Sequence, residues 1–286
     1  MNSKLVSVII PAFNCEKTIA EAIGSILSQS YNNLEVIVVN DNSTDNTASI
    51  VNEMQKSDSR LKIINSDLED HKRFDAKLKR NINAGYSARN AGLKIAKGDY
   101  ITFQDGDDIS LKNRIEIQVK LLEQYNATHV TTDWFRLDER YIGKSLDFNR
   151  YNNEIKPNVI GPSELVNMAR KNKSLLVKLL GPWHKIVPFK IKRLRFVNKL
   201  LLGGIEPYPG VTGIPLFKRE VLDKVKFRPL QERIWPSFMG RGADRDFSFQ
   251  VAETFINSYV FFIPLYMWRV KNENERYISI INKYLI

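Results

Sequence analysis

Cysteine is nearly absent from this chain, since the 286 residues contain a single one, Cys15. One cysteine excludes an internal disulfide and a metal site built from cysteines, so any metal must be held by oxygen or histidine ligands. No base lies near Cys15 in the sequence, and we therefore expect it to be a small apolar filler rather than a nucleophile.

Long hydrophobic runs are absent as well. The longest, such as VSVIIPAF and YVFFIP, fall well short of the ~20 residues that span a bilayer. The N-terminal MNSKLVSVIIPAFN leads directly into a strand pattern, without the apolar core and cleavage site of a secretory signal. We expect a cytoplasmic protein. With 43% apolar and 26% charged residues, the chain has the composition of a globular protein.

Acidic residues are missing from one segment, residues 165–205, called here the basic segment. It contains ten lysines and arginines, and the whole chain has a net charge of +11. Leucines, valines and isoleucines are interleaved with these cations, which favours docking on an anionic membrane surface, as a peripheral protein on the inner face of the membrane, or on an anionic acceptor. A solvated basic face explains the same pattern equally well. A basic nucleic-acid-binding protein is a further alternative, but such a protein would not need clustered aspartates beside a dinucleotide-type sheet, so we expect no nucleic-acid partner.

The first half of the sequence alternates strand and helix patterns. The β-branched runs LVSVII, LEVIVVND and RLKII predict strands buried on both faces, and helical spacing of apolar residues separates them. A helix over SARNAGLKIAKG, closed by Gly98 at its C-cap, then leads to the strand YITF. The order predicts an α/β fold with a mostly parallel sheet flanked by helices. The second half is less regular, with a helix, a strand THVTTDWF, the basic segment, a late helix and a last strand.

Polar motifs follow three of these strands: PAFN, NDNSTD and QDGDD. In an open parallel sheet, ligands bind outside the carboxyl ends of the strands, so we expect the three motifs to converge on one site.

The motif QDGDD places three aspartates within four positions, Asp105, Asp107 and Asp108. Two carboxylates one residue apart can both face one Mg²⁺ or Mn²⁺ ion, whose other ligands come from substrate phosphates and water. The alternative is an acidic turn that caps a helix beginning near Leu111. The like charges need a neutralising partner in either case.

Together these motifs resemble the inverting GT-A glycosyltransferases of family 2. The resemblance covers VSVIIPAFN, EVIVVNDNSTDNT and ARNAGLKIAKGDYITFQDGDD, about residues 5–110, and more faintly residues 211–255. It implies a GT-A fold, a nucleotide-diphosphate sugar donor and a Mn²⁺ or Mg²⁺ cofactor. A nucleotidyltransferase would instead need a Gly-rich loop after the first strand to bind a triphosphate, and PAFNCEKT lacks one.

The resemblance also implies roles for individual residues on the donor side. Asp41 would accept a hydrogen bond from a uracil-like ring, which a carboxylate does well because the bond is charge-assisted. Asp107 would bind the metal directly, and Asp105 would face the ribose and the metal. Asp108 would support this site or cap a helix. The remaining donor-binding residues would be Pro11, Ala12, Phe13, Asn14, Arg89 and Gly106.

On the acceptor side, the resemblance places the catalytic base in GRGADRDFSF, preceded by VTGIPLFKREVL. Asp244 matches the aspartate of the family's GED motif, while Ala243 replaces its usual glutamate, and Asp246 competes with Asp244 as the base. The alternative is that both aspartates cap the helix that follows. A catalytically impaired donor-binding module remains open because of Ala243.

The predicted organisation is a nucleotide-sugar-binding half, residues 1–110, and an acceptor-binding half, residues 111–286, that contains the basic segment. The predicted reaction moves a sugar, from a UDP-sugar in the favoured interpretation, to a hydroxyl of a saccharide or lipid-linked acceptor in cell-surface polysaccharide synthesis. The four tryptophans are candidates for stacking on a sugar, although a buried tryptophan more often belongs to a core. A lone histidine such as His184 is more often structural than a ligand.

Overall fold

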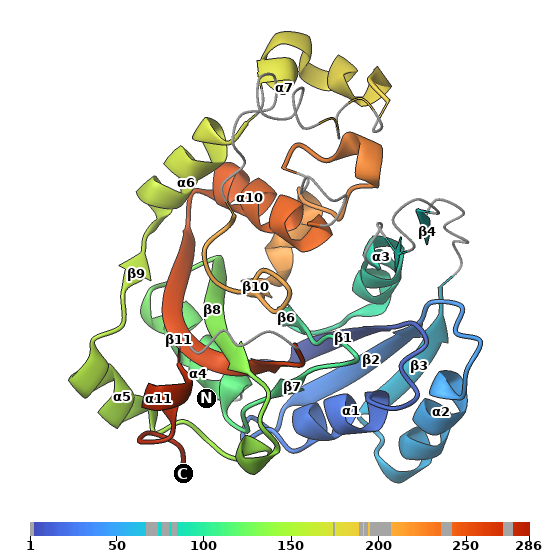
Figure 1. The fold of residues 1–286 in the computed structure, drawn as a ribbon, viewed down its shortest axis with the longest axis vertical. Coiled ribbons are helices and arrows are strands. Elements are labelled where there is room, and N and C mark those ends of the chain that lie inside the picture. Colours follow the sequence, from blue (N-terminus) through green and yellow to red (C-terminus); the bar gives the residue numbers. More distant parts are fainter. Residues whose placement is uncertain are drawn as a thin grey trace.

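The computed structural model describes residues 3–66, 74–75, 80–81, 85–173, 175–188, 191, 194, 207–235, 242–270 and 277–286. Within this part of the chain, one nine-stranded sheet forms the centre of the molecule (Figure 1), with strand order β3-β2-β1-β6-β10-β8-β11-β7 and β9 paired with β11. Its strands are β1 (Val6–Ala12), β2 (Leu34–Asn40), β3 (Leu61–Asn65), β6 (Tyr100–Phe103), β7 (Ile109–Ser110), β8 (His129–Arg136), β9 (Val159–Ile160), β10 (Leu216–Lys218) and β11 (Ser258–Trp268).

The first half of the sheet is parallel, as the alternation of strands and helices predicts. Strands β3, β2, β1 and β6 all run in the same direction. The side chains of β1 alternate between the two faces: Val6, Val8 and Ile10 join one core cluster, and Ile9 joins the other. Both clusters are apolar, which explains why these strands read as continuous hydrophobic runs.

Helices cover both faces of the sheet. Apolar residues of α1 (Ile19–Leu27), α2 (Thr47–Ser57) and α4 (Arg114–Gln124) pack into the larger core cluster. On the opposite face, α3 (Tyr86–Ile95) and α10 (Ala243–Phe255) share the second cluster. The prediction of an α/β fold with a mostly parallel, helix-flanked sheet is confirmed.

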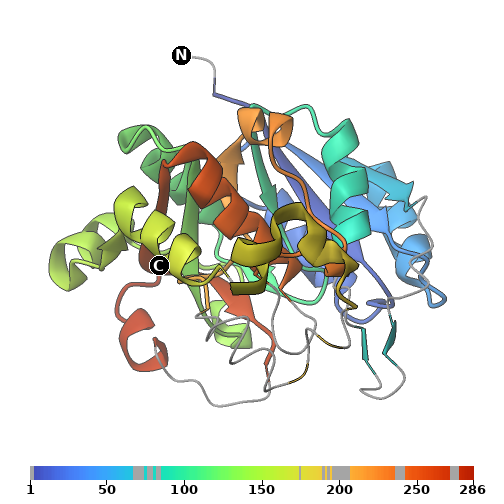
Figure 2. The same cartoon turned by 90° about the horizontal axis from the view of Figure 1, so that it is seen from above.

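The second half of the sheet is mixed. Strand β10 is antiparallel to both of its neighbours, β6 and β8, while β11 is parallel to β8. Figure 2 shows the N-terminal strands in blue beside the later strands in green and red, so the sheet continues past residue 110. Three helices support this half: α5 (Phe148–Ile155), α6 (Pro162–Lys171) and α11 (Ile278–Ile281).

The prediction that Gly98 caps the third helix is wrong. Helix α3 ends at Ile95, and its C-cap is Ala96. A Cβ atom on Gly98 would lie 2.5 Å from the backbone nitrogen of Ser7 and 2.6 Å from the carbonyl oxygen of Tyr100. Glycine is therefore needed because two backbone segments approach each other closely at the start of β6, rather than for a helix end.

The basic segment is described in part. It contains most of α6, then α7 (Leu175–Leu180) and the 3₁₀ helix η2 (Gly181–Ile186). Residues 189–190, 192–193 and 195–206 lie outside the described residues, as do most of the charged residues 67–80. Three further 3₁₀ helices are η1 (Glu139–Tyr141), η3 (Arg219–Asp223) and η4 (Leu230–Glu232). No helix in the described part of the chain is both long and apolar enough to cross a bilayer.

Candidate active site

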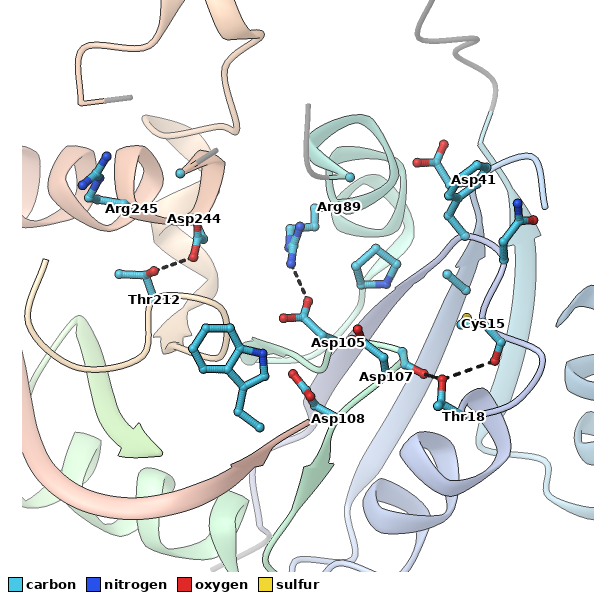
Figure 3. Close-up of a pocket in the computed structure, with 18 of the residues that line it drawn as sticks. Cys15, Thr18, Asp41, Arg89, Asp105, Asp107, Asp108, Thr212, Asp244 and Arg245 are labelled. Atoms are coloured by element: carbon cyan, nitrogen blue, oxygen red, sulfur yellow. Dashed lines mark hydrogen bonds and ion pairs between the residues drawn. The ribbon is translucent and has the colours of Figure 1, made fainter. Parts of the chain in front are cut away.

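A cavity of about 930 Å³ opens at the carboxyl ends of β1, β2 and β6 (Figure 3). The loops after these strands form one wall, and the beginning of α10 forms the opposite wall. The structure thus brings together the three motifs that follow the strands. It also places in the lining every donor-side residue named from the sequence, namely Pro11, Ala12, Phe13, Asn14, Asp41, Arg89, Asp105, Gly106 and Asp107.

The loops after β1 and β2 are tied to each other by side-chain hydrogen bonds. Asn14 has a positive φ of 49°, and its Oδ1 accepts a hydrogen bond from the backbone N–H of Thr44 at 2.8 Å. The backbone N–H of Asn14 donates to Oγ of Ser43 at 3.1 Å. These bonds fix one end of the cavity, where Phe13 is 42% exposed and Asp41 lies at the end of β2.

Asp105 is held by an ion pair with Arg89. The guanidinium Nη2 lies 2.6 Å from Oδ1 of Asp105, and the arginine side chain is itself buried between Phe103 and Phe227. Burial raises the pKa of Asp105 to about 6 against the opposing charge of Arg89, and the negative charges of Asp107 and Asp244 add to the increase. The positive charge of Arg89 therefore offsets part of the repulsion among the clustered aspartates.

The loop that carries Asp107 is clamped from two sides. Thr18 at the start of α1 donates a hydrogen bond to the carbonyl oxygen of Gly106 at 2.9 Å, and Nε of Arg269 donates to the carbonyl oxygen of Asp107 at 2.9 Å. The loop lies close against Cys15, because a Cβ on Gly106 would be 3.1 Å from its Sγ. Burial raises the pKa of Cys15 to about 11, so the thiol stays protonated and acts as a packing residue.

Asp108 stabilises this loop through hydrogen bonds and does not cap a helix. Its Oδ2 accepts a hydrogen bond from the hydroxyl of Tyr266 at 2.8 Å, and its Oδ1 accepts one from the backbone N–H of Arg269 at 2.7 Å. Helix α4 begins only at Arg114, with Asn113 as its N-cap, so the helix-capping interpretation of Asp108 is wrong. Burial, reinforced by the charges of Asp105 and Asp107, raises the pKa of Asp108 to about 8.

The donor set suits a hard divalent cation that is shared with a ligand. The carboxylate of Asp107 is exposed in the cavity, and Asp105 has one oxygen engaged by Arg89 and a second, Oδ2, toward Gly213. No group of three or more acidic, histidine or cysteine side chains in the described part of the chain has the arrangement of a metal site. Mg²⁺ and Mn²⁺ accept such sparse sites, because substrate phosphates and water supply the remaining ligands.

Asp244 lies in the wall opposite Asp105 and Asp107. Its Oδ2 accepts a hydrogen bond from the hydroxyl of Thr212 at 2.5 Å (Figure 3). It occupies the first turn of α10, after Gly242, whose φ of 96° starts the helix in a left-handed conformation that favours glycine. Its neighbour Ala243 is 1% exposed and packs into the core.

Asp246 is placed differently, because its side chain is fully buried and does not line the cavity. Arg228 binds it through two nitrogens at 2.6 and 2.8 Å. The backbone N–H groups of Ile234 and Trp235 donate to its Oδ1 at 2.8 and 3.0 Å. These bonds connect α10 to residues 228–235, so the structure leaves Asp244 as the carboxylate of this helix that faces the cavity.

The four tryptophans divide between the core and the surface. Trp235 is fully buried, and its Nε1 donates to the carbonyl oxygen of Ala169. Trp268 lines the main cavity, and with Trp134 it borders a second cavity of about 220 Å³ that also contacts Thr212 and Asp244. The two rings are perpendicular, with centroids 4.7 Å apart. Trp183 is exposed and lies elsewhere.

His184 is structural, as expected of a lone histidine. It is buried, with Nδ1 2.8 Å from the carbonyl oxygen of Gly181 and Nε2 3.3 Å from that of Glu232.

Sequence reasoning did not assign roles to Thr212 and Arg269. The threonine stands in VTG, which resembles the segment before the family's base, but nothing in the sequence joins it to Asp244, 32 positions later.

Sequence comparison places the chain in a known family. The profile of glycosyl transferase family 2 matches residues 7–180, more than half of the chain, and the chain belongs to this family. Resemblance to that family is thus confirmed. Among curated relatives, the Escherichia coli UDP-Glc:alpha-D-GlcNAc-diphosphoundecaprenol beta-1,3-glucosyltransferase WfgD is 37% identical over 128 residues, 45% of this chain and 45% of that protein.

A second relative, the putative glycosyltransferase EpsE of Bacillus subtilis, is 45% identical over 126 residues, 44% of this chain and 41% of that protein. The matched region thus spans less than half the length of either relative. Among solved structures, Staphylococcus aureus TarS 1–349 with UDP-GlcNAc has a TM-score of 0.52 at 19% identity, covering 94% of this chain and 60% of that one.

The mannosyltransferase PcManGT of Pyrobaculum calidifontis, solved with GDP-Man and Mn²⁺, has a TM-score of 0.53 at 18% identity and covers 99% of this chain and 61% of that one. At this identity, the likeness to TarS and PcManGT concerns the fold alone. It confirms the GT-A fold that the sequence motifs imply.

Proposed function

We propose that this chain is an inverting glycosyltransferase that moves a sugar from a UDP-sugar to a hydroxyl of a saccharide or lipid-linked acceptor in cell-surface polysaccharide synthesis. The observation that carries the proposal is the position of Asp244, across one cavity from Asp105 and Asp107. Asp105 and Asp107 would bind the metal on one wall, and the carboxylate of Asp244 lies on the other. The reacting sugar would then lie between the two walls.

The donor would bind along the loops after β1 and β2. Phe13 and Asn14 would flank the base, and Asp41 at the end of β2 would accept the N–H of a uracil ring. Two similar proteins support UDP: WfgD is a glucosyltransferase with UDP-Glc as its donor, and TarS was solved with UDP-GlcNAc. GDP-Man in PcManGT shows that the same fold also occurs with a guanine nucleotide.

The diphosphate would lie beside Asp105 and Asp107, and these two carboxylates would hold a Mn²⁺ or Mg²⁺ ion. Such a cation supplies positive charge that stabilises the leaving diphosphate. Arg89 keeps Asp105 oriented through their ion pair, and Thr18 and Arg269 hold the backbone of the Asp107 loop in place. The protein's contribution here is orientation of the two carboxylates.

Transfer requires a base, because the acceptor hydroxyl is too weak an acid to ionise at neutral pH. The hydroxyl oxygen would form a bond to the anomeric carbon while the bond from that carbon to the diphosphate oxygen breaks. The diphosphate leaves with the electron pair of the broken bond, and the hydroxyl proton passes to Asp244. Because Oδ2 of Asp244 accepts a hydrogen bond from Thr212, its Oδ1 would accept this proton. Attack opposite to the leaving group inverts the anomeric centre.

The acceptor would enter from the smaller cavity. Asp244 borders it, and Trp268 connects it to the main cavity with 41% of its side chain exposed. An indole face suits stacking on the apolar face of a pyranose ring. The name of WfgD, which specifies a sugar on a diphosphoundecaprenol, supports a lipid-linked acceptor.

The alternative of an impaired donor-binding module depends on Ala243. This side chain packs into an apolar cluster with Ala88 and Phe247 and does not line the cavity, whereas Asp244 does. Alanine in place of the family's usual glutamate therefore changes a buried position of α10, and the carboxylate of Asp244 still faces the cavity. This geometry favours an active enzyme.

The test is nucleotide release from a panel of UDP- and GDP-sugars in Mn²⁺ or Mg²⁺, with saccharide and lipid-diphosphate-linked acceptors. Acceptor-dependent release of UDP, and an inverted linkage in the product by NMR, support the proposal. Retention of the anomeric configuration contradicts the mechanism. Donor binding by calorimetry with no release at any acceptor supports the impaired module, and binding of a labelled oligonucleotide instead of nucleotide sugars supports the nucleic-acid alternative.

A further inference from the structure

Exposed apolar side chains are concentrated on α7 and η2. Leu179, Trp183 and Ile186 are 72%, 69% and 66% exposed, and Leu175 and Leu180 are also exposed. These five side chains, together with those of Lys178 and Lys185, are called here the α7–η2 surface. Single exposed apolar residues are ordinary on a protein, but several large ones within twelve positions mark an interaction site.

The orientation of this segment is fixed by its buried side. Val177 is 9% exposed, and His184 is hydrogen-bonded to the carbonyl oxygens of Gly181 and of Glu232 in η4. The exposed residues 175, 179, 183 and 186 follow one another at intervals of four, four and three, and Val177 and His184 lie between them. The apolar side chains therefore point outward because the inner face is already occupied.

The charged residues along this segment of the sequence are of one sign. Lys178 and Lys185 are exposed beside the apolar residues, and the basic segment has no acidic residue anywhere along its sequence. Lys173 is an exception among its cations, because it is bound to Glu253 at 2.5 Å. An apolar stripe flanked by lysines is the composition of a segment that lies in a membrane interface.

Three classes of partner differ in which side chains of the α7–η2 surface they would leave without a partner. A nucleic acid would neutralise Lys178 and Lys185 but would leave Leu179, Trp183 and Ile186 in water. A second copy of this chain would cover the apolar residues but would bring two basic segments together. An anionic bilayer satisfies both, because acyl chains accept the apolar side chains while headgroups pair with the lysines.

We propose that the α7–η2 surface docks this protein on an anionic lipid bilayer, with Leu179, Trp183 and Ile186 inserted at the level of the headgroups. Figure 1 shows α7 at the upper end of the molecule, beyond α6 and α10. Residues of α6 and α10 share a buried cluster that includes Leu165, Phe249 and Trp235. The docking surface is therefore connected through packed helices to the one that carries Asp244.

The experiment is co-sedimentation of the full chain with vesicles of phosphatidylcholine alone or with phosphatidylglycerol, at low and high salt and without any nucleotide sugar. We expect binding to the anionic vesicles at low salt, weaker binding at high salt and little binding to the neutral vesicles. A blue shift of tryptophan emission should accompany binding and disappear in Trp183→Phe, because Trp235 is buried and Trp134 and Trp268 lie at the cavities rather than on the α7–η2 surface. Donor binding and transfer do not enter this measurement, so it fails or succeeds independently of the proposed function.

Two variants separate the apolar and charged contributions. Leu179→Ser with Ile186→Ser, and Lys178→Glu with Lys185→Glu, should each weaken binding to anionic vesicles by more than about tenfold. Ile142→Ser with Ile95→Ser removes exposed apolar residues elsewhere and should leave binding unchanged, and thermal melts of all variants verify folding.

Three results overturn the proposal. The first is no binding of the unaltered chain to anionic vesicles at low salt. The second is equal binding to neutral vesicles. The third is a concentration-dependent dimer, seen by ultracentrifugation, whose formation alone accounts for the blue shift of Trp183.

Discussion

The hydroxyl of Thr212 donates a hydrogen bond to Oδ2 of Asp244 at 2.5 Å and so holds the carboxylate at the edge of the cavity. The two residues come from different parts of the chain, one from the loop before β10 and the other from the first turn of α10. Their bond fixes one oxygen of the proposed base, and this arrangement gives the first two predictions.

Asp244→Asn should strongly reduce transfer while UDP binding is preserved. The amide keeps the shape of the side chain and can still accept the hydrogen bond of Thr212 through its oxygen, but it cannot take the acceptor proton. General base catalysis commonly contributes about 10²- to 10⁴-fold, so kcat should fall by that factor. Calorimetry with UDP should give an unchanged Kd, since the proposed donor-binding residues Asp41, Arg89 and Asp107 line the other wall of the cavity.

The matched control is Asp223→Asn, the same change at an exposed residue at the end of η3. It should leave both kcat and Kd unchanged. Full activity of Asp244→Asn would show that the base lies elsewhere.

Thr212→Val should lower kcat and leave KM for the donor unchanged. A hydrogen bond to a charged group contributes about 1.5–3 kcal/mol, so losing the one that positions Asp244 should reduce kcat about 10- to 100-fold. Thr212→Ser keeps the hydroxyl and should restore most of the rate. If serine and valine behave alike in steady-state kinetics, the hydroxyl has no role in positioning the base.

Asp107→Ala should weaken binding of UDP in Mn²⁺ by about 10- to 100-fold, the size expected when a metal site loses a ligand or a group that orients one. EDTA should weaken binding to the unaltered chain to a similar extent and should have little further effect on the variant. Calorimetry measures both. Equal Kd values for the two proteins in Mn²⁺ would contradict the assignment of Asp107 to the metal.

Much of the first half of the fold could be predicted from the sequence, because its signals are local. Buried β-branched runs and helical spacing of apolar residues gave the elements, and the rule that parallel strands end at one edge brought Asn14, Asp41 and Asp107 together. The second half depends on pairings that are distant in sequence. The three residues of β10 carry little pattern of their own, yet they join the two halves of the sheet.

The choice between Asp244 and Asp246 shows the same limit at the site. Both aspartates lie in the first turn of one helix, so the sequence left them as competitors. The difference comes from Arg228, Ile234 and Trp235, which surround Asp246 and are placed by tertiary packing. Gly98 was misinterpreted for a similar reason, because the backbone of Ser7 that excludes a side chain there lies 91 positions away.

Asp246→Ala should destabilise the fold. It removes both carboxylate oxygens from Arg228 and from two backbone N–H groups in the interior. Breaking a buried pair by removing one partner costs about 3–5 kcal/mol, so the free energy of unfolding in urea should fall by that amount. Asp244→Asn should not change it. An unaltered urea midpoint for Asp246→Ala would show that this ion pair adds nothing to stability.

The last prediction concerns the pH dependence of stability and rests on His129 in β8. Its side chain is fully buried, and within the described part of the chain neither ring nitrogen has a hydrogen-bond partner. In the sheet, His129 lies opposite Phe217 of β10 and Ser258 of β11. The titratable ring that packs against it is that of Tyr208, and the two ring centroids are 6.3 Å apart. Burial lowers the pKa of His129 to about 3, and it raises the pKa of Tyr208, so both are neutral at pH 7.

In the unfolded chain, His129 takes up a proton near pH 6.5, whereas the folded chain excludes that proton down to about pH 3. The unfolded state therefore gains stability as the pH falls below 6.5, and folding loses about 1.4 kcal/mol per pH unit over this window. Between pH 7.5 and 5.5, urea titrations should show the unaltered chain losing about 1.4 kcal/mol more than His129→Phe, in which the titrating group is gone and the other groups serve as their own control. Parallel pH profiles for the two proteins would contradict this prediction, because they would mean that His129 is protonated equally in the folded and unfolded states.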